Sequence, residues 1–579
     1  MNTATFLEQF EHLAEAPNGI TKLRELILQL AVRGKLVPQD SGDEPATELV
    51  GRIQAEKQHL IDSKVIRRAK ALPDEPPART PYALPKGWSW ARVDDVIVSV
   101  VNGFSGKQQK EPTDFPITRI ETISEGSVDR TRVRYIADMP LEAREKHLLE
   151  PGDVLLSHIN SGVHVGKTAV YRGGESLFHG VNLLRIRLPC PSQMAGYFHV
   201  CMNALRFAGE FQRVAQHAVG QQSINQTKLR ALLISLPPLD EQERIVAKVD
   251  ELMALCDDLE AKQQAKRAMK NALNRASLHA LTEPNGTSLA TAWLRVRDHF
   301  DDLYTVPETV ADLRQTILQL AVMGRLVPQD PSDLPASELL KKIQAEKHRF
   351  IAEGTIRKPK PLPPIEKDES QTKLPSGWEN VRLGAISEIG TGTTPSRAEP
   401  AYWAGGTQDW VTSAQTGDPF IEHGSELVTT RAISECRLRV YPPGTLIVAL
   451  YGQGKTRGQI SELRIDASVN QACAAIQYLV EARELREYTK ILFWKMYHEI
   501  REQAAGGAQP NLNVGKITQI VMPLPPIAEQ KHIIAKVDQL MTLCDDLEAK
   551  LQQAQTDADN LLTAIIHELV ETKSEVASG

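Results

Sequence analysis

The chain has 579 residues, 41% of them hydrophobic and 24% charged, so it is too long for one core and has the composition of a soluble globular protein. Its net charge of -6 and pI of about 6.2 exclude a protein that grips nucleic acid by bulk positive charge. The 6 cysteines show no metal-ligand spacing, and no apolar run is long enough for a signal peptide or a membrane span. We therefore expect an intracellular, cytoplasmic protein with reduced cysteines and no metal.

The first predicted elements form a helical block that returns near the middle of the chain. "LRELILQLAVRGKLVPQD" at Leu23–Asp40 reappears as "LRQTILQLAVMGRLVPQD" at Leu313–Asp330. Apolar residues recur at helical spacing, Gly34 stands where a C-terminal cap belongs, and a second helix follows up to about residue 60. A long internal period indicates a duplicated architecture.

Proline-rich linkers follow both helical blocks and lead into two segments that hardly match each other. The first linker ends at Trp88 in "LPKGW" and the second at Trp378 in "LPSGW". Both segments contain short β-like runs broken by Gly, Pro, Asn and Ser, with a helix-like stretch near the end. We expect two compact α+β domains, the first insert domain (88–235) and the second insert domain (378–523).

A long helix is predicted after each insert domain. "LPPLDEQERIVAKVDELMALCDDLEAK" at Leu236–Lys262 returns, slightly changed, at Leu524–Lys550. The spacing of apolar residues predicts a coiled-coil seam in each helix. Its members are Ile245, Val249, Leu252, Cys256 and Leu259, and Ile533, Val537, Leu540, Cys544, Leu547 and Leu551.

The repeat predicts a circular arrangement. We expect the two long helices to pack antiparallel within one molecule. The block at 4–60 then completes the C-terminal helix, as the block at 311–350 completes the central one. This arrangement predicts chain ends that lie close in space.

These signals predict an α+β fold with two globular domains separated by long antiparallel coiled-coil helices, in an internal pseudo-twofold repeat. The predicted parts are 1–87 (helical block and linker), 88–235, 236–377 (central helical region and linker), 378–523, and 524–579 (C-terminal helix).

Gly-Lys-Thr occurs at equivalent places in the two insert domains, Gly166–Thr168 and Gly454–Thr456, about 288 residues apart. A nucleotide-binding P-loop requires a further glycine, but Ser161 and Ala449 stand at that position, and neither copy continues into a clear helix. An ATPase is therefore a weak alternative. A phosphate-contacting loop and a plain β-turn with a solvated lysine both remain open.

Polar loops recur near the start and the end of both insert domains. Asn and Gln side chains can pair with adenine, and Arg or Lys with guanine, so these loops are candidate DNA contacts. From loop position we select Ser105, Lys107, His158, Asn160, Lys167, Gln221, Asn225, Thr394, Ser396, Arg397, Gln453, Lys455, Arg457, Gln509 and Asn511.

No catalytic site is evident. The chain has no Asp/Asn-Pro-Pro-aromatic tetrapeptide of adenine methyltransferases, no GxGxxG after a strand and no GxSxG elbow. His147, His158, His164 and His179 scatter without ligand spacing. We expect no catalytic residues and no metal ligands.

The whole pattern resembles the specificity subunit of type I restriction–modification enzymes. "GTGTTPSRAEPAYWAGGTQDWVTS" at Gly390–Ser413 is close to a form seen at the start of that family's target-recognition domains. "SLPPLDEQERIV" at Ser235–Val246 and "PLPPIAEQKHII" at Pro523–Ile534 look like its closing signature.

The resemblance implies that each insert domain reads one half of a split, asymmetric site in double-stranded DNA, while the helices set the gap. It implies two modification subunits docked on the helices and restriction subunits joined through them. The chain would be non-catalytic and bind no cofactor, with S-adenosylmethionine, ATP and Mg on the partner subunits. A scaffold that binds no DNA is the alternative.

Overall fold

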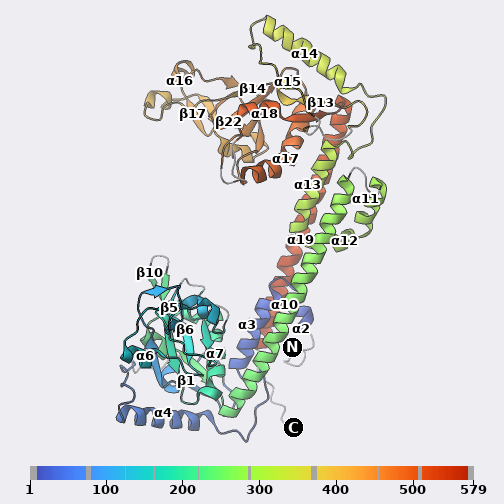
Figure 1. Cartoon of the computed structure of the whole chain (residues 1–579). Helices are drawn as coiled ribbons and strands as arrows, with labels where there is room; N and C mark the ends of the chain where they lie inside the picture. Colours follow the sequence, from blue (N-terminus) through green and yellow to red (C-terminus); the bar gives the residue numbers. More distant parts are fainter. Residues whose placement is uncertain are drawn as a thin grey trace. The chain divides into compact units, whose positions relative to one another are not determined.

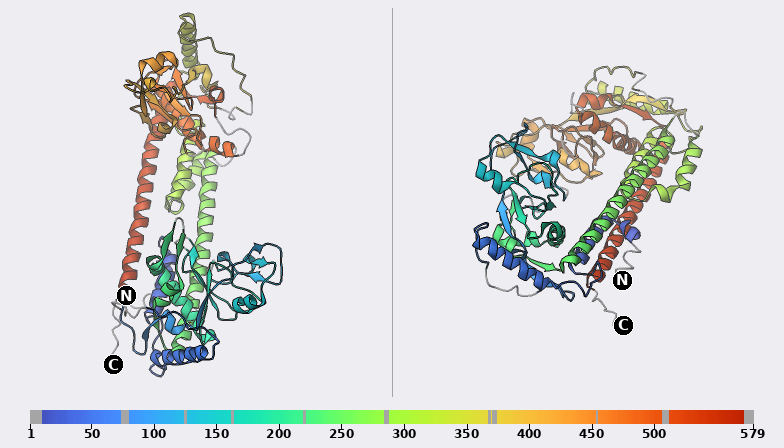
Figure 2. Two further views of the ribbon diagram at one scale, coloured as in Figure 1. Left: turned by 90° about the vertical axis from the view of Figure 1, so that its left-hand side faces the viewer. Right: turned by 60° about the horizontal axis from the view of Figure 1, so that its bottom comes forward.

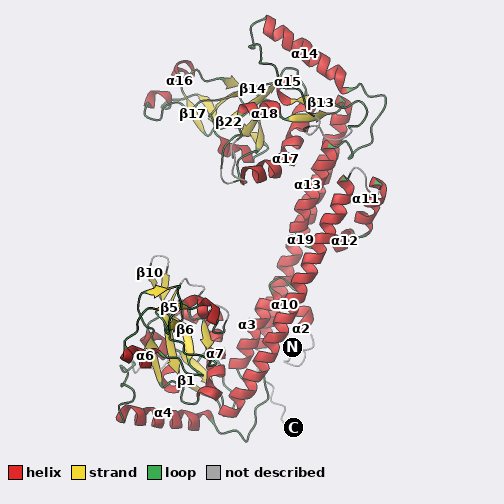
Figure 3. Cartoon of the chain, in the orientation of Figure 1, coloured by secondary structure: helices red, strands yellow, loops and turns green. Residues whose placement is uncertain are grey.

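The computed structural model separates into two compact units, Met1–Lys266 with Ala554–Gly579, and Arg267–Gln553. Each unit combines strands of one insert domain with helices from both long segments, and Figure 3 shows this mixture of helix and sheet. The predicted α+β class is confirmed. The structure describes residues 10–72, 80–123, 126–160, 164–218, 221–283, 288–366, 369, 374–452, 455–505 and 512–571.

In the first unit, helix α3 (Gly19–Val32) lies beside parts of α10 (Leu239–Thr282) and α19 (Ile527–Glu571), as Figure 1 shows. Arg24 forms ion pairs with Asp257 of α10 at 2.6 Å and with Glu260 at 2.8 Å. On the other side, Lys22 Nζ donates to Asp559 Oδ1 of α19 at 2.6 Å, and Lys35 Nζ donates to the Val570 carbonyl at 2.8 Å. The N-terminal block therefore completes the C-terminal helix, as predicted; residues 1–9 and 572–579 lie outside the described residues.

The second unit repeats the arginine and helix-end contacts with α13 (Glu308–Val322) in place of α3, while Asp312 stands at the position of Lys22. Arg314 forms ion pairs with Asp545 and Glu548 of α19, both at 2.6 Å. Arg325 Nη1 donates to the carbonyl of Glu283, just beyond the end of α10, at 3.0 Å. The predicted circular repeat is thus present at the level of individual contacts. Two short helices, α11 (Leu289–Asp298) and α12 (Phe300–Leu303), precede α13 and were not anticipated.

The predicted seam is buried in both units. Ile245, Val249, Leu252 and Cys256 of α10 share a core with Leu569 near the end of α19, and Leu259 packs against it. The other core joins Leu278 and Leu281 at the end of α10 with Ile533, Val537 and Cys544 of α19, and Leu540, Leu547 and Leu551 pack against it. The start of each long helix therefore packs with the end of the other, and α3 or α13 adds a third helix to each set.

The helical block ends where the sequence predicted. Gly34 has φ +65, a left-handed conformation that favours glycine, and a Cβ there would lie 2.5 Å from Pro85 Cγ. The chain then continues into α4 (Ala46–Asp62), which lies along the edge of the first insert domain (Figure 2). Lys57 Nζ of α4 donates to the Asp94 carbonyl at 2.7 Å and anchors it there.

The first insert domain is built on an antiparallel sheet in the order β2-β9-β6-β8. Helix α7 (Pro191–Phe207) packs against it, and two three-stranded sheets, β3-β5-β4 and β10-β11-β7, carry its loops. The strands are β1 (Ser89–Arg92), β2 (Ser99–Asn102), β3 (Gln108–Gln109), β4 (Pro116–Ile117), β5 (Arg134–Ile136), β6 (Val154–Ser157), β7 (Ile159–Asn160), β8 (Thr168–Val170), β9 (Leu183–Arg187), β10 (Gln216–Ala218), β11 (Gln221–Ser223) and β12 (Leu233–Leu236).

The second insert domain has a five-stranded sheet, β14-β22-β19-β20-β16, and a four-stranded sheet, β17-β15-β21-β18. Helix α17 (Arg483–Ala505) corresponds to α7. The strands are β13 (Glu379–Arg382), β14 (Ser387–Thr391), β15 (Gln408–Val411), β16 (Phe420–Ile421), β17 (Glu426–Val428), β18 (Val440–Tyr441), β19 (Leu446–Ala449), β20 (Ile460–Leu463), β21 (Ala467–Val469), β22 (Cys473–Tyr478) and β23 (Val521–Leu524).

A buried polar joint ties the first insert domain to its helices. The domain closes by antiparallel pairing of β1 with β12, and Trp88 stands just before β1. The Trp88 indole Nε1 donates to Glu241 Oε2 in the first turn of α10 at 2.9 Å, and Gln39 Nε2 donates to Glu241 Oε1 at 3.2 Å. Burial raises the pKa of the Glu241 carboxyl. One carboxylate therefore holds the domain, the loop after α3 and the long helix together.

The same joint closes the second insert domain. Trp378 Nε1 donates to Glu529 Oε2 at 2.8 Å, and Gln329 Nε2 donates to Glu529 Oε1 at 3.1 Å. Gln530, the next residue, donates to the Pro525 carbonyl at 2.9 Å. The recurring "LPP..EQ" sequence therefore has a structural cause: the glutamate holds the tryptophan before the first strand and the loop after the preceding helix, and the glutamine binds the turn that links domain to helix.

Candidate functional site

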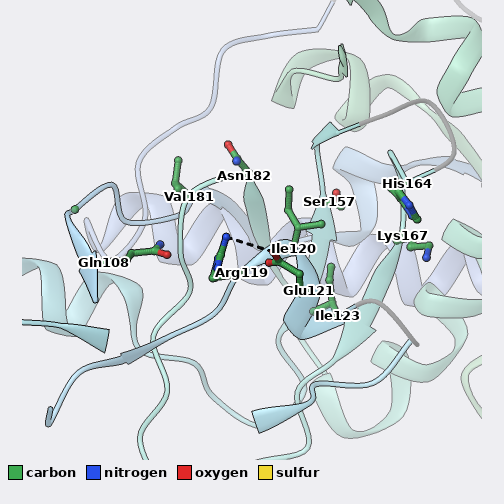
Figure 4. A pocket seen from close by; sticks show the side chains of 11 residues that line it. Gln108, Arg119, Ile120, Glu121, Ile123, Ser157, His164, Lys167, Val181 and Asn182 are labelled. Carbon is green, nitrogen blue, oxygen red and sulfur yellow. Dashed lines mark ion pairs between the residues drawn. The ribbon is translucent and has the colours of Figure 1, made fainter. Parts of the chain in front are cut away.

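The first insert domain contains a polar cavity of about 500 Å³ (Figure 4). Four separate stretches of the chain meet there, and Figure 4 marks the ion pair between Arg119 and Glu121, 3.3 Å apart. The lining residues are Gly106, Gln108, Arg119, Ile120, Glu121, Ile123, Ser157, His164, Lys167, Val181 and Asn182.

The loop before β3 reaches this cavity because the backbone packs closely behind it. Gly103 N donates to the Leu183 carbonyl at 3.1 Å, and a Cβ on Gly103 would lie 1.8 Å from the Gly180 carbonyl oxygen. Only glycine fits there. The predicted contacts Ser105 and Lys107 flank the lining residue Gly106, and both are exposed.

The β7–β11 pairing brings together candidates that are about sixty residues apart in sequence. Asn160 on β7 lies opposite Gln222 on β11, next to the predicted contact Gln221. His158 N donates to the Asn182 carbonyl at 3.2 Å, which joins this strand pair to the cavity wall. Burial lowers the pKa of His158, so its ring is neutral near neutral pH.

Asn225 has a structural role in addition to its predicted one. Its side chain caps helix α9 (Gln226–Ala231) by accepting a hydrogen bond from Lys228 N at 2.9 Å. The side chain is exposed, but one oxygen is engaged by the helix.

Sequence reasoning missed Arg119, Glu121, His164 and Asn182 as cavity residues. They lie outside the glycine-rich loops on which the selection was based, and only the folded sheet brings them beside Lys167. Their polar character was the one available signal, and polar residues are common on any surface.

The Gly-Lys-Thr segment of the first insert domain is not a P-loop. Gly166 and Lys167 lead into strand β8, whereas a P-loop continues into a helix whose N-terminus faces the phosphates. Thr168 is buried, and its hydroxyl lies 2.9 Å from His199 Nδ1. In the second domain, Lys455 and Thr456 lie in the turn before strand β20.

The expected equivalence of the two Gly-Lys-Thr segments is wrong. Gly166 N donates to the Ser157 carbonyl at 2.8 Å, and in the second domain Gly458 N donates to the Ala449 carbonyl at 2.9 Å. The lysine that follows Gly166 therefore corresponds to the glutamine that follows Gly458. The match of about 288 residues in sequence is a coincidence, because this strand pair and its turn are offset by 292 residues between the two domains.

In the second insert domain, Arg397 forms the centre of a polar and aromatic cluster. Its guanidinium makes two hydrogen bonds to the Glu426 carboxylate, one of 2.7 Å, and this pairing lowers the pKa of Glu426. The same group lies 3.9 Å from the Trp403 ring centroid and 5.4 Å from that of Trp410. Arg397 is thus held in place by its own domain.

The other second-domain candidates have varied settings. Thr394 donates to Gln471 Oε1 in the same region, and Ser396 accepts from Trp403 Nε1 through its carbonyl at 3.0 Å. Lys455 is exposed, while Arg457 is only 9% exposed and faces the interior. Gln453, Gln509 and Asn511 lie outside the described residues.

The scattered histidines prove partly adjacent. The rings of His147 and His179 lie 4.9 Å apart. Burial lowers the pKa of His147 to about 4 and that of His179 to about 3, so both are neutral core residues. Within the described part of the chain, no group of three or more His, Cys, Asp or Glu side chains could hold a metal ion. The described helices likewise include none long and apolar enough to span a membrane.

Comparison with known proteins gives consistent matches. A family model for the type I restriction modification DNA specificity domain matches residues 85–266 and 375–554. The specificity subunits of the type I restriction enzymes EcoAI and EcoEI of Escherichia coli are 32% and 30% identical, each over 94% of this chain and 93% of the relative. A crystal structure of the HsdS subunit from Thermoanaerobacter tengcongensis covers 85% of this chain and 98% of its own, at 17% identity and a TM-score of 0.40.

Proposed function

Because the chain belongs to the family of type I restriction–modification specificity subunits, we propose that each of its insert domains reads one half of a bipartite, asymmetric DNA site. The two matched segments each begin just before an insert domain and end in a long helix. One family domain per half of the chain favours two separate readers over one.

The observation that carries this proposal is the contrast between the joints and the insert domains. Trp88 and Glu241 in one half, and Trp378 and Glu529 in the other, make the same contacts at nearly the same distances. The insert domains, by contrast, carry different polar groups. The first has the polar cavity that Arg119 and Lys167 line, and the second has the Arg397 cluster. Two different polar surfaces, each attached to the helices by the same contacts, suit the reading of two different sequences.

The candidate contacts follow from the same proposal. Lys167 lines the first-domain cavity, and Ser105 and Lys107 flank the lining residue Gly106. Asn160 and Gln221 belong to the paired strands β7 and β11, and His158 directly precedes β7. We assign these residues to contacts with base edges or phosphates. In the second domain, Thr394 and Lys455 are the better placed candidates. Arg397 would hold its loop in shape, and Arg457 is too buried to reach a base without rearrangement.

The helices would provide spacing and assembly. Helix α10 has 44 residues and α19 has 45, so each would extend about 66 Å at 1.5 Å per residue. We propose that they fix the gap between half-sites and dock two modification subunits, with restriction subunits joined through these. The chain itself would be non-catalytic, and S-adenosylmethionine, ATP and Mg would be held by the partners.

Two alternatives are less favoured. The ATPase reading loses its motif, because strands follow both Gly-Lys-Thr segments. A scaffold without DNA reading leaves the different polar surfaces of the two insert domains without a purpose.

Reconstitution tests the proposal. The purified chain alone should not methylate DNA, and the chain with a modification subunit should methylate adenine within one bipartite sequence, measured by sequencing of modified bases. Methylation by the chain alone, or methylation by the complex without sequence preference, would contradict the proposal. Omission of the chain from the mixture is the control.

A further inference from the structure

A second cavity, of about 600 Å³, lies between the first insert domain and its helices. Leu28 of α3 and Val246, Val249 and Met253 of α10 form the helical wall. The insert domain contributes the opposite wall, which includes Ser127 and several cationic side chains. Among the first-domain candidates for DNA contact, Lys167 alone is a described lining residue of this cavity.

The helical wall is nearly the same in both halves of the chain. By the repeat, Leu28 corresponds to Leu318, and Val249 corresponds to Val537. Arg24, which also lines the cavity, corresponds to Arg314, and each makes the same pair of ion pairs. The exceptions are Val246, which corresponds to Ile534, and the neighbouring Glu25, which corresponds to Gln315; the larger differences come from the insert domains.

Strand register identifies the second-domain counterpart of Ser127. Ser127 forms a parallel bridge with Val170 at the end of β8. In the second domain, Phe420 pairs in parallel with Glu462, which occupies the same place on β20. Phe420 thus stands where the first domain has a serine.

The wall formed by the domain helices differs in the same direction. Tyr197 and Tyr488 correspond, because each donates its hydroxyl to the strand that closes its domain, at 3.0 Å and 2.9 Å. The residue before them is Gly196 in one helix and Glu487 in the other. Two small residues in the first domain replace a large aromatic and a long acidic side chain in the second.

In the second domain the corresponding space is filled and its charges are paired. Lys490 Nζ lies 4.6 Å from the Phe420 ring centroid and pairs with both Glu462 and Glu487 at 2.9 Å. The Arg464 guanidinium lies 3.9 Å from the centroid of the same Phe420 ring. Cation–π contact and buried ion pairs leave no demand for a ligand there.

Cationic side chains line the first-domain cavity, and no counterpart of Phe420 or Glu487 fills it. Arg130, Lys167, Arg172 and Arg206 line the cavity, and Asp250 is the acidic residue among its described lining residues. Where the second domain has Lys490, the first has His199, whose pKa burial lowers to about 4, so the ring is neutral.

Arg206 is the most informative of these cations. Its guanidinium lies 4.3 Å from the Phe207 ring centroid. Burial lowers the pKa of Arg206, and the nearby carboxylate of Glu25 on α3 opposes that shift. Its Nε is buried and has no hydrogen-bond partner among the described residues. Among the described residues no carboxylate forms an ion pair with Arg206, so the charge of this cavity-lining guanidinium is available to an anion.

We propose that this cavity binds a phosphate group, supplied either by the DNA backbone or by a free nucleotide. Guanidinium groups form bidentate bonds with phosphate oxygens, and several cations around one cavity balance a phosphate's charge. The site exists in the first half only, so it goes beyond the symmetric reading of two half-sites.

Calorimetric titration of the full chain with inorganic phosphate and with AMP tests the site. We expect binding by the natural chain, and about tenfold weaker binding by Arg206→Gln. Ser127→Phe, which introduces the second domain's filling residue, should also weaken binding. Arg464→Gln, which removes the arginine beside Phe420 in the filled domain, is the matched control and should leave binding unchanged.

A DNA titration distinguishes the two sources of phosphate. If the backbone supplies it, Arg206→Gln should weaken duplex binding and reduce the salt-dependence slope by about 0.9, the value for one phosphate. If a nucleotide supplies it, AMP should bind more tightly than phosphate and duplex binding should not change. Thermal melts verify that each variant folds.

The proposal is overturned if the natural chain binds neither phosphate nor AMP and Arg206→Gln leaves the duplex affinity and slope unchanged. It is also overturned if Arg464→Gln weakens binding as much as Arg206→Gln, because the effect would then be general charge. The phosphate and AMP titrations need no sequence recognition, so they stand independently of the proposed function.

Discussion

The helices and the insert domains differ in how far the repeat extends. In the helices, the copies agree contact by contact: Arg24 and Arg314 each bridge two acidic residues of a long helix. In the insert domains, even corresponding positions carry different chemistry, as Ser127 and Phe420 show. A fixed frame with variable domains allows specificity to change without loss of assembly.

The largest test of this contrast is exchange of one insert domain. Replacing residues 88–235 with the corresponding domain of another family member should change one half of the methylated sequence completely and leave the other half and the gap as they were. The joint supports this expectation, because Trp88 and Glu241 lie at the domain's border. Modified-base sequencing of DNA from a host with the hybrid gives the result; altered specificity in both halves would refute two independent readers.

The frame was predictable from sequence because its physical signals are local and periodic. Helical spacing located the seam from Ile245 to Cys256, and Gly34 marked the end of the first helix. The short helix α11 was missed because the repeat supplies no second copy of Leu289–Asp298 with which to compare it.

The candidate site was only partly predictable, because it depends on strand register. The sequence located Lys107 and Lys167, but Arg119 and Asn182 join them only through pairing of distant strands. It also matched the two Gly-Lys-Thr segments, although hydrogen bonds place Gly166 opposite Gly458. The loops before and after this turn differ in length between the two domains, and each such difference shifts the apparent alignment.

The two insert domains should differ in their stability at acidic pH. His179 in the first domain is buried, and burial lowers its pKa to about 3 from an unfolded value near 6.5. The unfolded chain therefore binds a proton at His179 that the folded chain does not bind. The stability that this group contributes is fully present above pH 6.5 and declines by about 1.4 kcal/mol per pH unit as the pH falls from 6.5 towards 3.

The measurement is hydrogen exchange at several pH values, read separately for peptides of each insert domain. We expect the first domain to lose protection at a higher pH than the second, and His179→Gln to flatten its pH dependence. The exposed His423→Gln in the second domain is the control. Equal acid sensitivity of both domains would contradict the role of the buried histidine.

The two joints should respond equally, because their geometry is the same. Trp88→Phe and Trp378→Phe each remove an indole donor from a buried carboxylate, Glu241 or Glu529. The free energy of unfolding should fall by about 1–3 kcal/mol in each case, the usual result of leaving a buried polar group unsatisfied. Chemical denaturation of the two variants measures it, and a large difference between them would show that the frame is less symmetric than its contacts indicate.

The smallest effect is expected at the ends of the long helices. Lys35 donates to the Val570 carbonyl near the end of α19, and Arg325 donates to the Glu283 carbonyl just past the end of α10. A cation at a helix C-terminus typically contributes about 0.3–1 kcal/mol, so Lys35→Met and Arg325→Met should each lower stability by that amount. Added salt should shrink both losses, since screening weakens charge–dipole attraction. Losses that differ in size or in salt dependence would show that the two ends of the circular repeat are not equivalent, and would place the asymmetry in the frame itself.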